Sequence, residues 1–93
     1  MKILKSNKFL EQLRIILRFI ALDSPSQARA FKQELNEKIK FLDDFPYKYR
    51  RSIHFESEEI RDMIFKGYVI PYFVDMNHNQ IIVIAISKYK DEI

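Results

Sequence analysis

The sequence predicts an α+β domain in which an antiparallel sheet packs against a two-helix hairpin, in the order β-α-α-β-β-β. Two segments with apolar residues at helical spacing, 9–20 and 28–42, precede three segments of β-like composition between residues 60 and 87. The helices themselves extend beyond these apolar positions and are separated by only one or two residues near Ser24, so they are expected to form an αα-hairpin. Helices grouped ahead of strands are typical of the α+β class.

The first helix is predicted from both its cap and its apolar face. Residues 2–5 are expected to form a short first strand, and Ser6 can then cap the helix because its hydroxyl accepts from amides of the first turn. The apolar side chains of the helix fall on one broad arc. They are Phe9, Leu10, Leu13, Ile16, Leu17 and Ile20.

The second helix has the clearest boundaries in the sequence. Ser24 suits the N-cap, Pro25 the first helical position, and Gln27 completes a capping box. The helix is expected to end near Asp43 or Asp44, because Pro46 disfavours helical geometry in the residue before it. Its predicted buried face consists of Ala28, Phe31, Leu35, Ile39 and Leu42.

Three strands are predicted after residue 59, following a polar connection over residues 45–59. They cover residues 60–65, 68–74 and 80–87. Lys66 and Gly67 form a tight turn, since glycine adopts positive φ at little cost. Residues 81–86 are apolar on both faces, which predicts a central strand. Pro71 offers no amide to a ladder, so a bulge or a locally unpaired edge is expected there.

Composition limits the classes of function that the chain can have. Its 93 residues are expected to form one domain over residues 1–93, with 47% apolar and 31% charged residues. The absence of cysteine excludes disulfides, thiolate zinc sites and thiol nucleophiles. No metal or cofactor is expected, because His54 and His78 are isolated and a single glycine cannot make a phosphate-binding loop. No apolar run is long enough to span a bilayer and no signal pattern is present, so a cytoplasmic protein is expected.

Two sets of basic residues are candidates for binding or catalysis. In the first, Lys48, Arg50 and Arg51 alternate with tyrosines and could contact phosphates and stack on bases, or form a solvated loop. The second set lies at the predicted sheet. Its members are Arg61, Lys66, Lys88 and Lys90. Convergent cations can stabilise a phosphoryl-transfer transition state, but the same residues could equally be an electrostatic patch or ordinary rim charges.

Apolar residues on the first helix suggest a surface for a partner. Ile15, Phe19 and Leu22 follow one another at helical spacing, away from the main apolar arc. They either pack against the second helix or form a groove for an amphipathic segment of another protein. The second alternative would leave an exposed apolar patch in the free chain.

The chain resembles the RelE/ParE superfamily of type II toxins. The resemblance is carried by the element order, by "DSPSQARAFKQELNEKIKFLDDFP" in the helical part and by "IRDMIFKGYVIPYFVD…QIIVIAISK" in the strands. It implies a small toxin that an antitoxin neutralises by wrapping around it. RelE-like members cleave messenger RNA on the ribosome, whereas ParE-like members poison DNA gyrase without known catalytic residues.

The resemblance also assigns candidate catalytic positions. Arg61 matches an arginine that opens the second strand in ParE-like toxins, and Lys88 falls where they often have histidine. Lys90 falls near their terminal arginine, and Tyr89 is comparable with a RelE-like terminal tyrosine. The arginine that RelE-like enzymes use after the Gly-Tyr pair is replaced by Val69.

A ParE-like toxin acting on gyrase is therefore expected, with no enzymatic activity. A metal-independent ribonuclease needs a group that activates the 2′-hydroxyl, and a lysine can do this only if its pKa lies well below about 10.4. Nothing in the sequence indicates the burial that would lower the pKa of a lysine so far. The alternatives are a metal-independent, ribosome-dependent endoribonuclease and an inactive antitoxin-binding module. For all three, an acidic or amphipathic antitoxin is expected to cover the helix hairpin and the sheet in a toxin–antitoxin hetero-oligomer.

Overall fold

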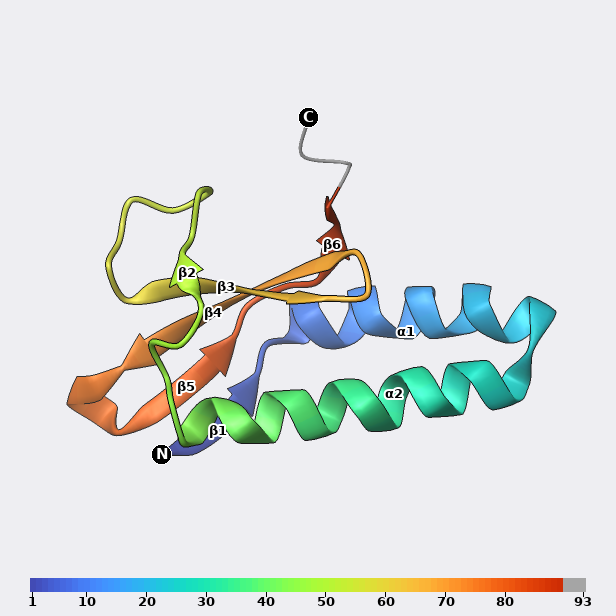
Figure 1. Cartoon of the computed structure of the whole chain (residues 1–93), viewed down its shortest axis with the longest axis horizontal. Helices are drawn as coiled ribbons and strands as arrows, with labels where there is room; N and C mark the ends of the chain where they lie inside the picture. The colour runs from blue at the N-terminus through green and yellow to red at the C-terminus, as the bar shows by residue number, and fades with distance from the viewer. Residues whose placement is uncertain (90–93) are drawn as a thin grey trace.

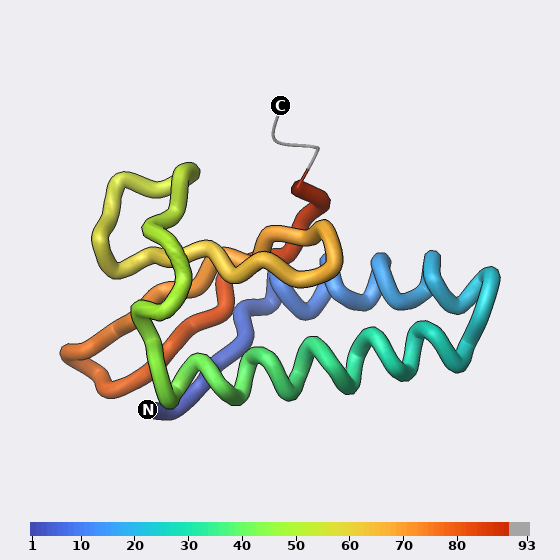
Figure 2. Tube along the Cα trace, viewed as in Figure 1, coloured from blue at the N-terminus to red at the C-terminus, as the bar shows by residue number. Residues whose placement is uncertain are grey.

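Two long antiparallel helices lie along one face of a sheet, and the turn between them extends beyond the sheet (Figures 1 and 2). The computed structural model describes residues 1–89. In this part of the chain the helices and strands are β1 (Lys2–Lys5), α1 (Asn7–Asp23), α2 (Pro25–Lys40), the 3₁₀ turn η1 (Phe41–Asp43), β2 (Arg50–Arg51), β3 (Ile60–Phe65), β4 (Tyr68–Asp75), the 3₁₀ turn η2 (Met76–His78), β5 (Gln80–Val83) and β6 (Ser87–Lys88). None of these helices is both long and apolar enough to cross a membrane.

Local capping sets the helix boundaries as the sequence predicts. The Ser6 hydroxyl accepts from the Phe9 amide at 3.0 Å and so begins α1. The Ser24 hydroxyl accepts from the Gln27 amide at 3.2 Å, with Pro25 at the first position of α2. Helical structure ends at Asp43, through η1, which confirms the predicted end.

The sheet is mixed, which corrects the prediction of a purely antiparallel one. Among the described strands the order is β1-β5-β4-β3-β2, and β6 also pairs with β4. β1 pairs with β5 in parallel, with Ile3 opposite Ile81. The helix hairpin and the strands β2 to β4 lie between these two strands in the chain, so no tight turn forces them to run antiparallel. β5 lies between β1 and β4, which confirms the prediction of a central strand.

The last predicted strand is interrupted opposite Pro71. Tyr72 pairs with Val83 and Val69 pairs with Ser87, so two residues of β4 face three residues, 84–86, of the other chain segment. This is the bulge that Pro71 predicts, and it divides one expected strand into β5 and β6. The free backbone groups are bonded to the start of α1. The Ser6 hydroxyl donates to the Ile84 carbonyl at 2.6 Å, and the Ile86 amide donates to the Gln12 side chain at 2.9 Å.

The β3–β4 turn has the geometry expected from its sequence. Lys66 and Gly67 adopt φ of +48° and +83°, as in a type I′ hairpin turn. Beside this turn, Phe31 of α2 makes edge-to-face contacts with Phe65 and Tyr68, with ring centroids 5.2 and 5.6 Å apart. The turn is thereby fixed against the helix hairpin.

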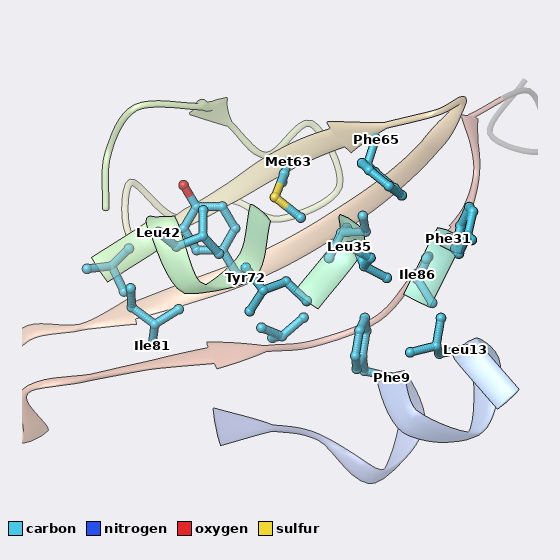
Figure 3. Packing of buried hydrophobic residues seen from close by; sticks show 14 residues of the cluster. Phe9, Leu13, Phe31, Leu35, Leu42, Met63, Phe65, Tyr72, Ile81 and Ile86 are labelled. Atoms are coloured by element: carbon cyan, nitrogen blue, oxygen red, sulfur yellow. The ribbon is translucent and has the colours of Figure 1, made fainter. Parts of the chain in front are cut away.

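The core lies between the hairpin and the sheet (Figure 3). Its largest fully buried side chain is Tyr72, whose hydroxyl donates to the Pro46 carbonyl at 2.6 Å. Burial raises the pKa of the Tyr72 hydroxyl to about 12. The hydrogen bond holds the 45–51 segment against the sheet. Around Tyr72 the cluster includes Phe9, Leu13, Phe31, Leu35, Ile39, Leu42, Met63, Phe65, Ile70, Val74, Ile81, Val83 and Ile86.

Candidate functional site

Two arginines of the predicted basic segment are paired with carboxylates at the β2–β3 end of the sheet. Arg50 lies 3.5 Å from the carboxylate of Asp62, which is fully buried, and Arg51 lies 3.2 Å from that of Glu58. The third cation, Lys48, is exposed and lies 5.5 Å from the centre of the Tyr49 ring. The segment therefore presents less free positive charge than its sequence suggests.

Arg61 is used by the fold. Its guanidinium donates to the Glu58 carbonyl at 3.0 Å and to the Tyr49 carbonyl at 3.3 Å. It also stacks over the Tyr47 ring, 4.8 Å from the centroid. The side chain thus joins the segment before β2 and the end of the β2–β3 connection to the sheet, through two of its five N–H donors and the stack on Tyr47.

Lys66 is also paired. Its ammonium lies 2.8 Å from the Glu34 carboxylate, which joins the β3–β4 turn to α2. Both side chains are about half exposed, so this ion pair contributes little to stability.

The structure does not bring Arg61 and Lys88 together. Arg61 lies opposite Tyr72 on one side of β4, whereas Lys88 lies opposite Tyr68 on the other side. Tyr68 and Tyr72 are four residues apart on the strand, which corresponds to about 13 Å. The structure does bring Arg50 and Tyr89 together, with the guanidinium carbon 5.8 Å from the ring centroid. Lys90 lies outside the described residues.

Lys88 is the exposed cation around which two hollows meet. Within residues 1–89 no ion pair or hydrogen bond of its ammonium is found. A groove of about 400 Å³ runs between β6 and α1, lined by Gln12, Ile15, Ile16, Phe19, Tyr68, Ile86, Ser87 and Lys88. A second hollow of about 490 Å³ is lined by Ile64, Gly67, Tyr68, Lys88 and Tyr89. Tyr68 and Lys88 belong to both, so the hollows adjoin at β6.

The apolar residues singled out on α1 do not pack against α2. Ile15, Phe19 and Leu22 are 56%, 66% and 80% exposed, which contradicts the alternative that they are core residues of the hairpin. Ile15 and Phe19 form one wall of the groove beside β6, and Leu22 continues the surface to the tip of the hairpin. The free chain therefore has the exposed apolar patch expected of a partner-binding surface.

Several residues of these surfaces were not predicted from the sequence. Tyr68 and Gln12 line the groove, and Gln12 accepts from the Ile86 amide where the chain between β5 and β6 leaves the ladder. Asp62, on a strand of otherwise mixed pattern, is fully buried and has one oxygen without a partner. Phe41 and Phe45 are exposed at the end of α2 and line another hollow of about 250 Å³. Their apolar character gave no signal, since core and exposed phenylalanines look alike in a sequence.

No metal centre is found in the part of the chain that the structure describes. There, no group of three or more histidine or carboxylate side chains is positioned to hold an ion. The Asp75 carboxylate instead accepts from the His78 and Gln80 side chains, and the hydrogen bond with His78 lowers the pKa of that carboxyl. These contacts fix the β4–β5 turn.

The fold, with its helix hairpin on a mixed sheet, is that of RelE/ParE-type toxins. It matches a solved structure of the chromosomal ParDE toxin–antitoxin system from P. aeruginosa with a TM-score of 0.74, 19% sequence identity and coverage of 95% of each chain. The family described as the ParE toxin of type II toxin–antitoxin system, parDE, matches residues 3–92. The chain belongs to this ParE toxin family. No curated protein sequence matches it significantly.

Proposed function

We propose that this ParE-family toxin blocks DNA replication by binding DNA gyrase, and that it does so without cleaving RNA. The observation that carries the proposal is the identity of the residue that follows Gly67 and Tyr68. This position holds Val69, which is 1% exposed in the sheet, in place of a catalytic arginine. A side chain buried there cannot contact a scissile phosphate.

The arrangement of the other candidate residues also supports binding over catalysis. A ribonuclease without a metal needs a base and cations around one phosphate. Arg61 donates to two backbone carbonyls, and Lys88 lies on the opposite side of β4. The described residues therefore offer dispersed cations, which suit a protein or nucleic-acid surface better than an active centre.

A cognate antitoxin is the second part of the proposal. An exposed apolar surface that includes Ile15, Phe19 and Leu22 is costly in water, and a partner's apolar segment would remove it from solvent. Such a partner would hold the toxin in a hetero-oligomer. The isolated toxin should then bind a dye for apolar surface more strongly than the complex does. The reverse result would contradict this assignment of the surface.

The proposed target is tested with purified toxin and gyrase. Toxin added to a supercoiling reaction should stop supercoiling, and antitoxin added first should preserve it. The matched control is a Leu22→Asp variant, which changes the proposed antitoxin surface and should inhibit gyrase in the presence of antitoxin. Supercoiling that continues at a large molar excess of toxin would exclude gyrase as the target.

The ribonuclease alternative predicts a different order of events in cells. Labelled thymidine and labelled methionine are followed during the first minutes after induction. DNA synthesis should fall first if gyrase is the target. If protein synthesis falls first and transcripts acquire new 5′ ends, the chain is a ribosome-dependent endoribonuclease. If neither falls and growth continues, it is an inactive antitoxin-binding module.

A further inference from the structure

On its outer edge, β6 pairs with no other strand among the described residues. The Tyr89 amide donates to the Gly67 carbonyl at 2.8 Å, so Tyr89 and Gly67 form a hydrogen-bonded pair directly beyond the paired residues of β6 and β4. Such pairs alternate along an antiparallel ladder, and the intervening residue directs its N–H and C=O away from the partner strand. Lys88 is that intervening residue. Its backbone groups therefore point outward, in the same direction as the Ile86 amide that reaches Gln12.

The other edges of the sheet are protected. β1 has lysine at both ends, and the Lys5 ammonium donates to the Asn36 side chain of α2 at 3.1 Å. β2 consists of two arginines. Short strands and charged side chains are common ways to block unwanted pairing. β6 is also short and carries a lysine, but it lies beside an apolar groove of about 400 Å³ that offers side-chain contacts to an added strand.

The electrostatics of the same region specify the charge of the segment that fits. Among the described residues that line the groove and the adjoining hollow, Lys88 is the charged one, and no carboxylate is present. A peptide with apolar side chains and one carboxylate is complementary to the apolar groove and to the Lys88 ammonium. An added strand would lie about 4.8 Å from β6 and direct alternate side chains toward Ile15, Ile16 and Phe19.

From these observations we infer that an extended, carboxylate-bearing segment of the antitoxin adds to the outer edge of β6. Its backbone pairs with Lys88, its alternate apolar side chains fill the groove beside α1, and its carboxylate binds the Lys88 ammonium. This inference rests on the proposed neutralisation by an antitoxin. It adds that neutralisation covers Lys88, a predicted site cation that has no ion pair within the described residues.

Amide hydrogen exchange tests the pairing in the unmodified chain. The probes are overlapping synthetic peptides that together cover the antitoxin sequence, with the intact toxin–antitoxin complex as reference. The peptide that binds should slow exchange of the Lys88 amide at least tenfold. The Tyr89 amide, already bonded to Gly67, is the internal control and should change little. A Lys88 amide that exchanges equally fast in the free and bound chain overturns the inference.

A pair of variants separates the backbone contact from the side chain. Lys88→Pro removes the outward amide and leaves the ladder bonds of Ser87 and Tyr89 in place, whereas Lys88→Ala retains the amide. Both lose the ammonium, so Lys88→Pro should bind the peptide at least tenfold more weakly than Lys88→Ala. Equal affinities would exclude strand addition. If Lys88→Pro does not fold, the exchange experiment on the unmodified chain still decides.

The carboxylate is tested by a double-mutant cycle. Replacing the peptide's acidic residue with glutamine should weaken binding about fivefold to the unmodified toxin and leave binding to Lys88→Met unchanged. Equal effects on both proteins would refute the ion pair. An antitoxin that does not bind the toxin at all would refute the proposed neutralisation together with this inference. One that binds while the Lys88 amide stays exposed would refute only the inference.

Discussion

The β2–β3 end of the sheet and the β6–α1 side use the same residue types in opposite ways. At the β2–β3 end, Arg50 is paired with a buried carboxylate and Arg61 donates to backbone carbonyls. On the β6–α1 side, Lys88 faces an apolar groove without an ion pair to any described residue. Cations of the first kind hold the fold together, and a cation of the second kind is available to a partner. Substitutions should therefore affect stability in the first region and binding in the second.

The largest expected effect is that of Arg50→Ala. This change leaves the Asp62 carboxylate buried without its charged partner, which should lower the free energy of unfolding by about 2.5 kcal/mol. Urea denaturation measures the loss. The double variant Arg50→Ala/Asp62→Asn should be more stable than the single one, because the uncompensated charge is gone. A single variant as stable as the unmodified chain would show that the ion pair does not support this end of the sheet.

The next effect is a pH dependence that arises from Tyr72. Its folded-state pKa of about 12 lies above the ordinary value of 10.0, so folding favours the neutral hydroxyl. The associated stability is fully present below pH 10 and is lost as the pH rises through 12. The unmodified chain should therefore lose about 2 kcal/mol more than Tyr72→Phe between pH 10 and 12. Parallel denaturation curves for the two proteins across this range would contradict the assignment.

Arg61→Ala should cost about 1.5 kcal/mol, because two hydrogen bonds and the stack on Tyr47 are lost. Toxicity per folded molecule should change little, although the free energy of unfolding falls. Arg61→Lys is the matched control, since it keeps the charge and loses the planar donor geometry. It should be nearly as destabilised as Arg61→Ala. A folded Arg61→Ala protein without toxicity would return this residue to the functional site.

Lys88→Ala should have the smallest effect on stability, within about 0.5 kcal/mol, because an exposed charge contributes little to folding. Its affinity for the antitoxin should fall about fivefold, because the ion pair is lost, and its toxicity should fall although the fold stays intact. Thermal denaturation and a growth assay with graded induction measure the two quantities. A destabilisation as large as that of Arg50→Ala would remove the contrast between the two regions.

Local sequence determined the helices and turns of this protein. Ser6, Ser24 and Pro25 set the starts of the two helices through hydrogen bonds within one turn. Lys66 and Gly67 set the β3–β4 turn, and the missing amide of Pro71 predicted the bulge opposite it. Each of these features depends on neighbours within a few residues, or on a group that proline always lacks. The resemblance to RelE/ParE toxins likewise rested on the order of such elements and on the sequence within them.

Tertiary structure alone decided the direction of β1 and the use of each cation. β1 joins β5 across most of the chain, and no local rule fixes whether such distant strands run parallel. Arg50, Arg61 and Lys88 have similar charge, yet their partners come from other strands and loops. An ion pair or a free edge depends on distances of a few ångströms between residues far apart in sequence. The sequence could therefore identify the cations of the candidate site, and only the folded chain separated Arg50 and Arg61, which stabilise it, from Lys88, which is left for a partner.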